Sequence, residues 1–363
     1  QTIGQGGMGV VYLARQNTIG RDVAVKAVRE DRRSAQASEE LLREAWITGR
    51  LEHPNVVPVH ALGVDEQSSP LFVMKRVEGI SWEEALEDVE SLPDMYQGED
   101  ALEAHLEIFE QVCQAVHFAH SRGILHRDIK PENVMLGHFG EVYLVDWGIA
   151  VSMKQDPDGQ LPSLASVAGP AGTPGYMAPE MAAGDGEAMG PWTDVYLLGA
   201  TLHQIVTGEL RHHGEDLYEM MFGSYRSELY DYESSIPEEL GAICNRATHR
   251  DPDERHESAE ALRQDVATFR RQRSAIQMTE TLQKRLETLE ALAEADELEE
   301  SEAIQAHRLF GECRFGFSEA LEVYPQSQRA RLGLRQTRLH MIDIELRLEN
   351  SSAAEALLDE LDP

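Results

Sequence analysis

The chain has few cysteines, and no apolar run in it is long. Its three cysteines, Cys113, Cys244 and Cys313, are far apart and odd in number. This argues against a disulfide framework and favours a reducing, cytoplasmic compartment. No stretch approaches the roughly 18 apolar residues of a membrane-spanning helix, and no signal peptide is recognisable. We therefore expect neither a disulfide-rich secreted fold nor a membrane span in these residues.

Basic residues are also scarce. Lys and Arg number 32 against 65 Asp and Glu, which gives a formal net charge of −33. A surface this acidic repels a phosphate backbone, so we expect no nucleic-acid partner. It would attract basic protein segments, although an acidic surface that only keeps the protein in solution explains the composition more simply.

The remaining composition is that of an ordinary globular protein, with 42% hydrophobic and 27% charged residues. At 363 residues the chain is about twice the usual domain length, which predicts two units. It opens at Gln1 without a methionine. We therefore expect a piece of a longer protein, in which a membrane anchor or sensor outside these residues is left open.

The apolar pattern predicts a small β-rich lobe followed by a larger helical lobe, an α+β arrangement. Strands are expected at residues 10–14, 22–28, 71–74, 134–136 and 142–145. Helices are expected at residues 38–51, 101–121, 193–207, 238–248 and 258–271. The turn between the last two strands contains glycine at both ends and predicts a hairpin.

A glycine-rich loop opens the chain, with Gly4, Gly6, Gly7 and Gly9 followed by Val11. Glycine lets the backbone approach phosphate oxygens, and the N–H groups of such a loop can face them. The same pattern opens dinucleotide-binding folds, but there the next element is a helix. Here the next element is a strand, which favours a kinase.

Lys26 lies on the strand at residues 22–28, where its ammonium group would reach the α- and β-phosphates of a nucleotide. It needs a carboxylate to hold it in place. Glu44 on the following helix is the candidate, with Glu39 and Glu40 as competitors. We prefer Glu44 because the stretch at residues 51–55 ends this helix where the corresponding helix of a kinase would end.

Residues 126–133 read H-R-D-I-K-P-E-N, the most specific motif of the chain. Phosphoryl transfer depends mainly on positioning and on neutralisation of charge. Asp128 would orient the attacking hydroxyl and accept its proton, and Lys130 would steady the γ-phosphate. Asn133 and Asp146, the latter in an Asp-Trp-Gly triplet, would bind magnesium.

Together these motifs resemble the eukaryotic-like protein kinase superfamily, most closely the bacterial serine/threonine kinases, from Ile3 to about Arg271. The resemblance implies a bilobal kinase fold that uses ATP and Mg²⁺, with Mn²⁺ as an alternative ion. The adenine site that it implies comprises Ile3, Val11, Ala24, Met74, Lys75, Val77 and Met135. Of these, Met74 would be the gatekeeper, and Lys75 and Val77 would meet the purine edge through their backbone.

The same resemblance indicates the hydroxyl class. Lys130 follows the catalytic aspartate by two residues, and Thr173 matches the threonine that bonds both, a pattern typical of serine/threonine kinases. Asp194 resembles the aspartate that braces the catalytic loop. Arg255 resembles the arginine that pairs with the glutamate of the A-P-E motif, here Glu180.

Two positions depart from the family pattern. Trp147 stands where phenylalanine is usual, and Lys75 stands at a hinge position where glutamate is common. The first leaves the magnesium-binding carboxylate in place, and the second makes its nucleotide contact through the backbone. We therefore expect neither to prevent ATP binding.

Regulation and substrate choice are less constrained by the sequence. Arg127 resembles the family's receiver of a phosphorylated activation loop, and Ser152, Ser163 and Ser166 are candidate autophosphorylation sites between residues 146 and 180. Glu132 would favour a basic residue before the target hydroxyl, or it makes only a structural contact. His212 and His213, beside a glycine, are interpreted as a surface turn rather than as metal ligands.

The last quarter of the chain predicts only helices. We expect a kinase domain at residues 1–271, a helical linker with a possible short coiled coil at 272–303, and helical hairpins at 304–363. Ala320 and Ala354 lie 34 residues apart (354 − 320), the period of a tetratricopeptide repeat, but the expected tryptophan and glycine are missing. These hairpins are a candidate protein-binding module. The main alternative to an enzyme is a pseudokinase scaffold that recruits partners through them.

Overall fold

The computed structural model describes residues 1–6, 9–96, 100–154, 156, 159–167, 169–295 and 298–361. The chain forms two compact units, Gln1–Ala267 and Thr268–Pro363. All three cysteines are buried free thiols. Among the described residues, no helix has the length and apolar character that a membrane crossing requires.

The first unit begins with a five-stranded antiparallel sheet in the order β1-β2-β3-β5-β4. Its strands are β1 (Thr2–Gln5), β2 (Gly9–Gln16), β3 (Arg21–Val28), β4 (Val59–Val64) and β5 (Pro70–Lys75). Helix α1 (Ala35–Arg50) begins where the Ser34 side chain accepts a hydrogen bond from the Ala37 N–H at 3.1 Å. The helix buries Leu41 and Ala45 against Phe72 of the sheet, which fixes its position beside β3 and β5.

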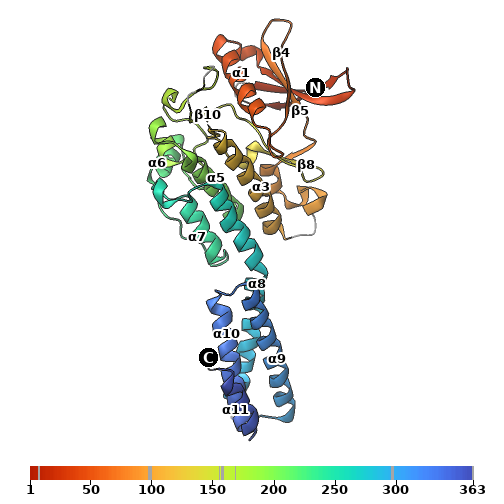
Figure 1. Cartoon of the computed structure of the whole chain (residues 1–363), viewed down its shortest axis with the longest axis vertical. Helices are drawn as coiled ribbons and strands as arrows, with labels where there is room; N and C mark the ends of the chain where they lie inside the picture. Colours follow the sequence, from red (N-terminus) through yellow and green to blue (C-terminus); the bar gives the residue numbers. More distant parts are fainter. Residues whose placement is uncertain are drawn as a thin grey trace. The chain divides into compact units, whose positions relative to one another are not determined.

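The rest of the first unit is mostly helical, and its described residues add two small sheets, β10-β7 and β6-β8-β9. Its helices are α2 (Trp82–Glu87), α3 (Ala101–Ser121), α4 (Pro179–Ala182), α5 (Pro191–Thr207), α6 (Leu217–Arg226), α7 (Glu238–Ala247) and the start of α8 (Ala259–Glu294). Its strands are β6 (Gly79–Ser81), β7 (Ile124–Leu125), β8 (Val134–Gly137), β9 (Val142–Leu144) and β10 (Val151–Ser152). Figure 1 shows the sheet with α1 in red and orange, followed by the helical part in yellow to teal. The predicted α+β arrangement is confirmed.

Helix α5 is the centre of the helical part. Every residue from Thr193 to His203 is buried, so the helix is apolar all round except for a few polar groups with specific partners. It ends at Gly208, whose φ of 76° lies in the left-handed region that favours glycine. Through Asp194 this helix accepts the backbone N–H groups of His126 and Arg127, so it supports the loop that carries the 126–133 motif.

The second unit packs the remainder of α8 with α9 (Glu300–Val323), α10 (Gln328–Arg347) and α11 (Ser351–Asp359). Four apolar residues of the predicted linker, spaced three or four apart along α8, form a stripe that is buried in this core: Leu282, Leu286, Leu289 and Ala293. Phe317 is fully buried there, and a Cβ added at Gly333 would lie 2.5 Å from its ring. The stripe therefore packs within the chain, and Gly333 allows the close approach of α9 and α10.

The interpretation of residues 212–213 as a surface turn is wrong for His212. His212 is 3% exposed, and its Nε2 lies 2.9 Å from the hydroxyl of Tyr196. His203 on α5 is fully buried, with its Nδ1 2.9 Å from the hydroxyl of Tyr232. Burial, reinforced by Arg211, lowers the pKa of each of these two histidines to about 3, so both are neutral in the folded protein.

These neutral histidines predict acid lability of the first unit. An unfolded histidine titrates near 6.5, so below that pH only the unfolded state gains the proton, and stability falls until pH approaches 3. At pH 5 each group costs about 2 kcal/mol at most. Urea unfolding at pH 7 and pH 5 should show a smaller pH-dependent loss for His203→Phe than for the unsubstituted protein. The exposed His213→Gln is the control, and an unchanged pH dependence in His203→Phe would contradict the assignment.

Candidate active site

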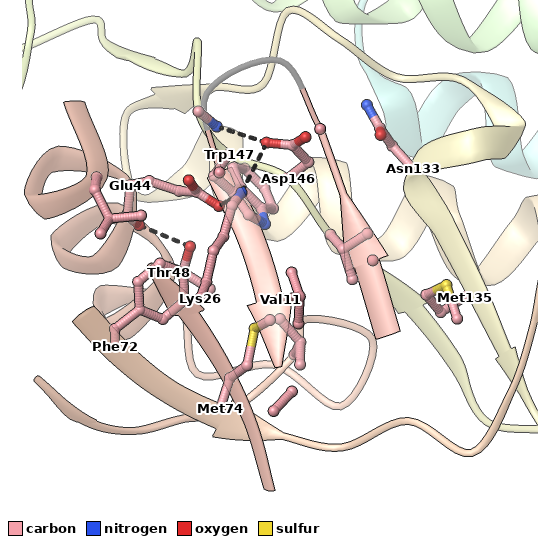
Figure 2. Close-up of a pocket in the computed structure, with 18 of the residues that line it drawn as sticks. Val11, Lys26, Glu44, Thr48, Phe72, Met74, Asn133, Met135, Asp146 and Trp147 are labelled. Carbon is pink, nitrogen blue, oxygen red and sulfur yellow. Dashed lines mark hydrogen bonds and ion pairs between the residues drawn. The ribbon is translucent and has the colours of Figure 1, made fainter. Parts of the chain in front are cut away.

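A cavity of about 510 Å³ is lined by the five-stranded sheet and α1 on one side and by residues on either side of β8 and after β9 on the other (Figure 2). Residues predicted to bind nucleotide line it: Ile3, Gly4, Gly6, Gly9, Val11, Ala24, Lys26, Met74, Lys75, Val77 and Met135. Glu44, Asp128, Glu132, Asn133 and Asp146 also line it. Gly7 falls outside the described residues. The residues that line this one cavity come from a stretch of the chain that is nearly 150 residues long, from Ile3 to Ile149.

Several lining residues have no counterpart in the sequence prediction. They are apolar or small side chains of the sheet, of α1 and of neighbouring loops: Leu41, Thr48, Val57, Phe72 and Val145. Their apolar character signals burial in the sequence, but burial against protein and burial against a cavity give the same signal.

The ammonium group of Lys26 joins two carboxylates inside the cavity. Its Nζ donates to Glu44 Oε1 at 2.5 Å and lies 3.4 Å from Asp146 Oδ1. The competitors of Glu44 have other partners, since Glu39 pairs with Arg43 and Glu40 accepts from Gln36. Strand β3, helix α1 and the loop after β9 therefore meet at one charged group.

The charge states of this trio follow from its burial and its mutual attraction. Burial disfavours the Lys26 ammonium, but Glu44 and Asp146 outweigh it and raise the pKa of Lys26. Burial likewise opposes ionisation of Asp146, but Lys26 and His126 lower the pKa of that carboxyl. Burial is the main reason that the pKa of Glu44 is raised, with Lys26 opposing it. Asp146 is thus held as an anion beside a charged lysine.

Asp128 is held by side chains on both sides of its carboxylate. The hydroxyl of Thr173 donates to Oδ1 at 2.8 Å, and Asn133 Nδ2 donates to Oδ2 at 2.9 Å. Asn133 also donates its amide nitrogen to the Asp128 carbonyl at 2.7 Å, and no hydrogen bond to its amide oxygen is seen from the residues that the structure describes. Lys130 pairs with Glu132 in the same loop.

Asp194 of α5 supports this loop from below. Its carboxylate accepts the backbone N–H of His126 and of Arg127, both at 2.8 Å, and lies 2.8 Å from His120 Nε2. The side chain is fully buried, and although burial opposes it, the hydrogen bond from His120 and the nearby His126 lower the pKa of Asp194. A buried anion is therefore satisfied by the loop that it positions.

Two non-glycine residues of the site have left-handed backbones, Arg127 with φ 70° and Asp146 with φ 61°. Such conformations cost about 1–3 kcal/mol and persist where the surroundings impose them. At Asp146 the Gly148 N–H donates to Oδ1 at 3.3 Å. The fully buried Trp147 packs its ring 4.4 Å from that of His126. The bulkier tryptophan is accommodated without displacing the carboxylate from Lys26.

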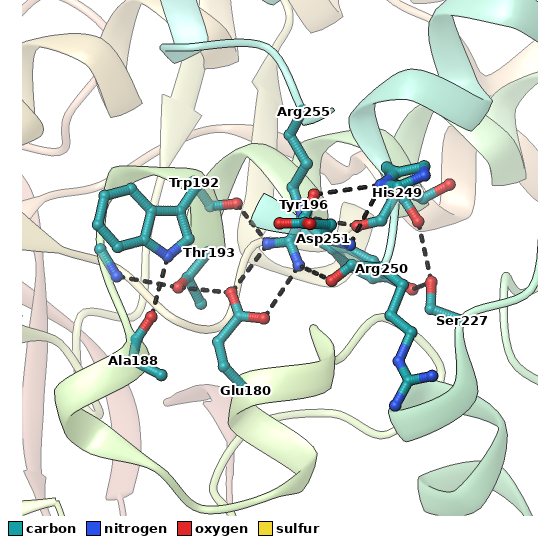
Figure 3. A network of polar contacts seen from close by, with 12 residues as sticks. Glu180, Ala188, Trp192, Thr193, Tyr196, Ser227, His249, Arg250, Asp251 and Arg255 are labelled. Carbon is teal, nitrogen blue, oxygen red and sulfur yellow. Dashed lines mark hydrogen bonds and ion pairs between the residues drawn. The ribbon is translucent and has the colours of Figure 1, made fainter. Parts of the chain in front are cut away.

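A second polar network fixes the segment after Thr173 (Figure 3). Arg255 donates to both oxygens of Glu180, at 2.8 and 3.0 Å, and to the carbonyl of Trp192 at 2.9 Å. Thr193 donates to Glu180 Oε1 at 2.8 Å. Both charged side chains are buried, so their bidentate pairing compensates for lost hydration.

The candidate regulatory residues are placed differently from one another. Arg127 donates from Nη1 to the Ile149 carbonyl at 3.1 Å, while its buried Nε and Nη2 have no hydrogen-bond partner among the described residues. Ser152 is 5% exposed and donates to the Lys154 carbonyl. Ser163 is partly exposed and Ser166 is exposed. Ser152 is therefore the least accessible of the three candidate hydroxyls.

Glu83 of α2 and Glu132 of the 126–133 loop lie close to each other and to Tyr176. Burial is the main cause that raises the pKa of Glu83, and the nearby Glu132 raises it further. Burial and the same two glutamates raise the pKa of Tyr176 as well. Negative charge is therefore concentrated next to Asp128, where a substrate segment would approach.

Comparison with known proteins matches residues 1–267 to the protein kinase domain. The chain is 37% identical over 283 residues to the serine/threonine-protein kinase PknD of Chlamydia caviae. It is 36% identical over 281 residues to PknD of Chlamydia abortus and 36% over 282 residues to PknD of Chlamydia pneumoniae. Each match covers 73% of this chain and 30% of the relative. The chain thus spans about three tenths of the length of these curated relatives.

Proposed function

The chain belongs to the protein kinase family, and from this we propose that it transfers the γ-phosphoryl group of ATP to serine and threonine hydroxyls of proteins. The observation that carries the proposal is the arrangement of Lys26, Glu44, Asp128, Asn133 and Asp146 around one cavity. A pseudokinase scaffold has no need of all five, with Lys26 paired to Glu44 and Asp146 and with Asn133 bonded to Asp128. The relatives' printed names, which are those of serine/threonine kinases, agree with the proposal.

The residues present fit ATP and a magnesium ion. The cavity offers an apolar part near Val11, Ala24 and Met135 and a charged part near Lys26 and Asp146. Magnesium prefers oxygen ligands and is usually bound by one or two protein side chains together with phosphates. Asp146 and the amide oxygen of Asn133 meet that preference; Mn²⁺ accepts the same ligands. When bound, the metal-nucleotide complex supplies the phosphoryl group and neutralises its charge.

The protein's own groups then position the acceptor. Asp128 holds the substrate hydroxyl in line and accepts its proton, while Thr173 and Asn133 fix the direction of the carboxylate. Burial opposes the charged form of Lys130, but Glu132, Asp128 and Asp146 raise its pKa, so a charged ammonium group near Asp128 stabilises charge on the transferred group. Lys26, held by Glu44, orients the α- and β-phosphates.

We further propose that the kinase is regulated by autophosphorylation at Ser163 or Ser166. The unpartnered Nε and Nη2 atoms of the buried Arg127 support this, because a phosphate group supplies the acceptors that they lack. The exposure of Ser166 also supports it. A phosphate group on either serine binds Arg127 and thereby holds the chain around that serine against the 126–133 loop.

Glu132 and Glu83 favour substrates with a basic residue close to the target hydroxyl. Their concentration of negative charge beside Asp128 supports this specificity, because a cationic side chain there relieves the mutual repulsion. The acidic composition of the whole chain acts in the same direction over longer distances.

We also propose that helix α10 of the second unit presents a protein-binding surface. Leu332, Leu339 and Leu346 are 58%, 42% and 55% exposed and recur every seven residues along α10, a pattern typical of helix docking. We also place the kinase unit in a reducing compartment, in keeping with its free cysteines.

Phosphoryl transfer is tested with radiolabelled ATP, the purified chain and a basic acceptor protein, with and without Mg²⁺. Label should appear only with the metal, on serine or threonine, and Asp128→Asn should reduce it by about 10²-fold or more. The exposed Asp231→Asn is the matched control. Absence of metal-dependent label, or equal labelling of Asp128→Asn, would support the scaffold instead. Label on the chain itself should map to Ser163 or Ser166, and mapping elsewhere would overturn the regulatory part.

Substrate preference is tested with two serine peptides that differ in one arginine near the target residue. The unsubstituted kinase should prefer the arginine peptide by about tenfold in kcat/KM, and Glu132→Gln should remove most of that ratio. In Glu132→Gln, Lys130 also loses its ion-pair partner, which would change the activity on both peptides alike. The ratio of the two kcat/KM values is therefore the readout. The exposed Glu90→Gln should keep the ratio; a ratio unchanged in Glu132→Gln would refute the specificity.

A further inference from the structure

Lys75 is the last residue of β5, at the point where the sheet leads into the rest of the first unit. Its backbone is fixed twice, since it pairs with Val23 in the sheet register and its N–H donates to the Pro58 carbonyl at 2.9 Å. The residue also lines the cavity. Its main chain therefore belongs to the upper wall of the cavity.

The side chain of Lys75 reaches strand β9, which pairs with the strand that carries the lining residue Met135. Its Nζ donates to the Tyr143 hydroxyl at 2.5 Å, lies 4.6 Å from the centre of that ring and 3.6 Å from Glu141 Oε1. The hydrogen bond with Tyr143 is the main cause that raises the pKa of Lys75, so the ammonium group is charged at neutral pH. Three interactions thus hold one cation on strand β9 and its turn.

The position of Tyr143 explains why its contact with Lys75 affects the cavity. Tyr143 on β9 pairs with Met135 on β8, and β8 pairs with β6, the strand that the chain enters at Gly79 directly after the hinge. Met135 lines the floor of the cavity, whereas Tyr143 is not among its lining residues. The hinge at residues 76–78 is therefore spanned by a second, non-covalent link from Lys75 to the strand behind the floor.

We propose that Lys75 is a positioning residue, and that its bond to Tyr143 keeps β5 and Met135 at the spacing that a nucleotide requires. The inference rests on the proposed ATP-dependent function. Without the link, the two walls separate more easily, and nucleotide binding must first restore their spacing. Asp128 and Asp146 make no contact with the link, so the transfer step itself is little affected.

Substitution of Tyr143 distinguishes a positioning role of Lys75 from a direct contact between Lys75 and the nucleotide. If Lys75 acted only by touching the nucleotide, removal of the Tyr143 hydroxyl would leave binding unchanged. If the link is what matters, Tyr143→Phe removes its hydrogen bond and Lys75→Met removes all three contacts of the ammonium group, so the double variant is no worse than Lys75→Met alone. Phenylalanine keeps the ring in place, so Tyr143→Phe preserves the packing of β9.

The test measures the Kd of a fluorescent ADP analogue with Mg²⁺, and KM for ATP and kcat, for the full chain and these three variants. Each single variant should raise Kd and KM by about threefold to tenfold, with kcat within about twofold. Lys284→Met in the second unit is the matched control. Nucleotide affinity unchanged in Tyr143→Phe, or losses that add in the double variant, would overturn the link. A chain that binds nucleotide but transfers no phosphate would instead contradict the proposed function.

Discussion

The geometry of the site depends on one buried carboxylate, that of Asp194. It accepts the backbone N–H groups of His126 and Arg127 and lies beside His120, so it fixes three groups from two other segments. Arg127 has a left-handed backbone that an unsupported loop would not retain. Asp128 is the next residue, so the direction of the proposed catalytic carboxylate follows from this anchor. Helix α5 is buried along most of its length, which gives the anchor a rigid base.

The nucleotide side of the site is built separately from the acceptor side. Lys26, Glu44 and Asp146 come from a strand, a helix and a loop, and their ion pairs join these three elements at one point. Asp146 links the two sides. Burial opposes its ionisation, but Lys26 on the nucleotide side and His126 on the acceptor side both lower the pKa of its carboxyl. The Lys75–Tyr143 bond adds a constraint at the far edge of the cavity. The two sides meet in one cavity, yet each has its own support, which allows their contributions to be separated by substitution.

The sequence predicted the chemical identity of the site better than its supports. Contiguous motifs such as residues 126–133 carry their chemistry in their order, and the resemblance to a family supplied Asp194 and the Glu180–Arg255 pair. The Lys75–Tyr143 bond joins residues 68 positions apart with no motif around either. His212 was expected on the surface and is buried, because a tyrosine hydroxyl satisfies its polar nitrogen. Ser152 and Ser166 look alike in sequence and differ in exposure only after β10 forms. Long-range contacts and burial of this kind have no local signature.

The role of the Asp194 anchor is tested most directly by kcat and nucleotide affinity of Asp194→Asn. Asparagine keeps one acceptor oxygen but turns an N–H₂ group toward a site where the loop presents donors. We expect kcat to fall by about 10²-fold because the catalytic carboxylate loses its position, while the Kd for Mg·ADP changes by less than about threefold. Circular dichroism should remain that of the folded protein. An unchanged kcat, or a parallel loss of nucleotide binding, would contradict the account.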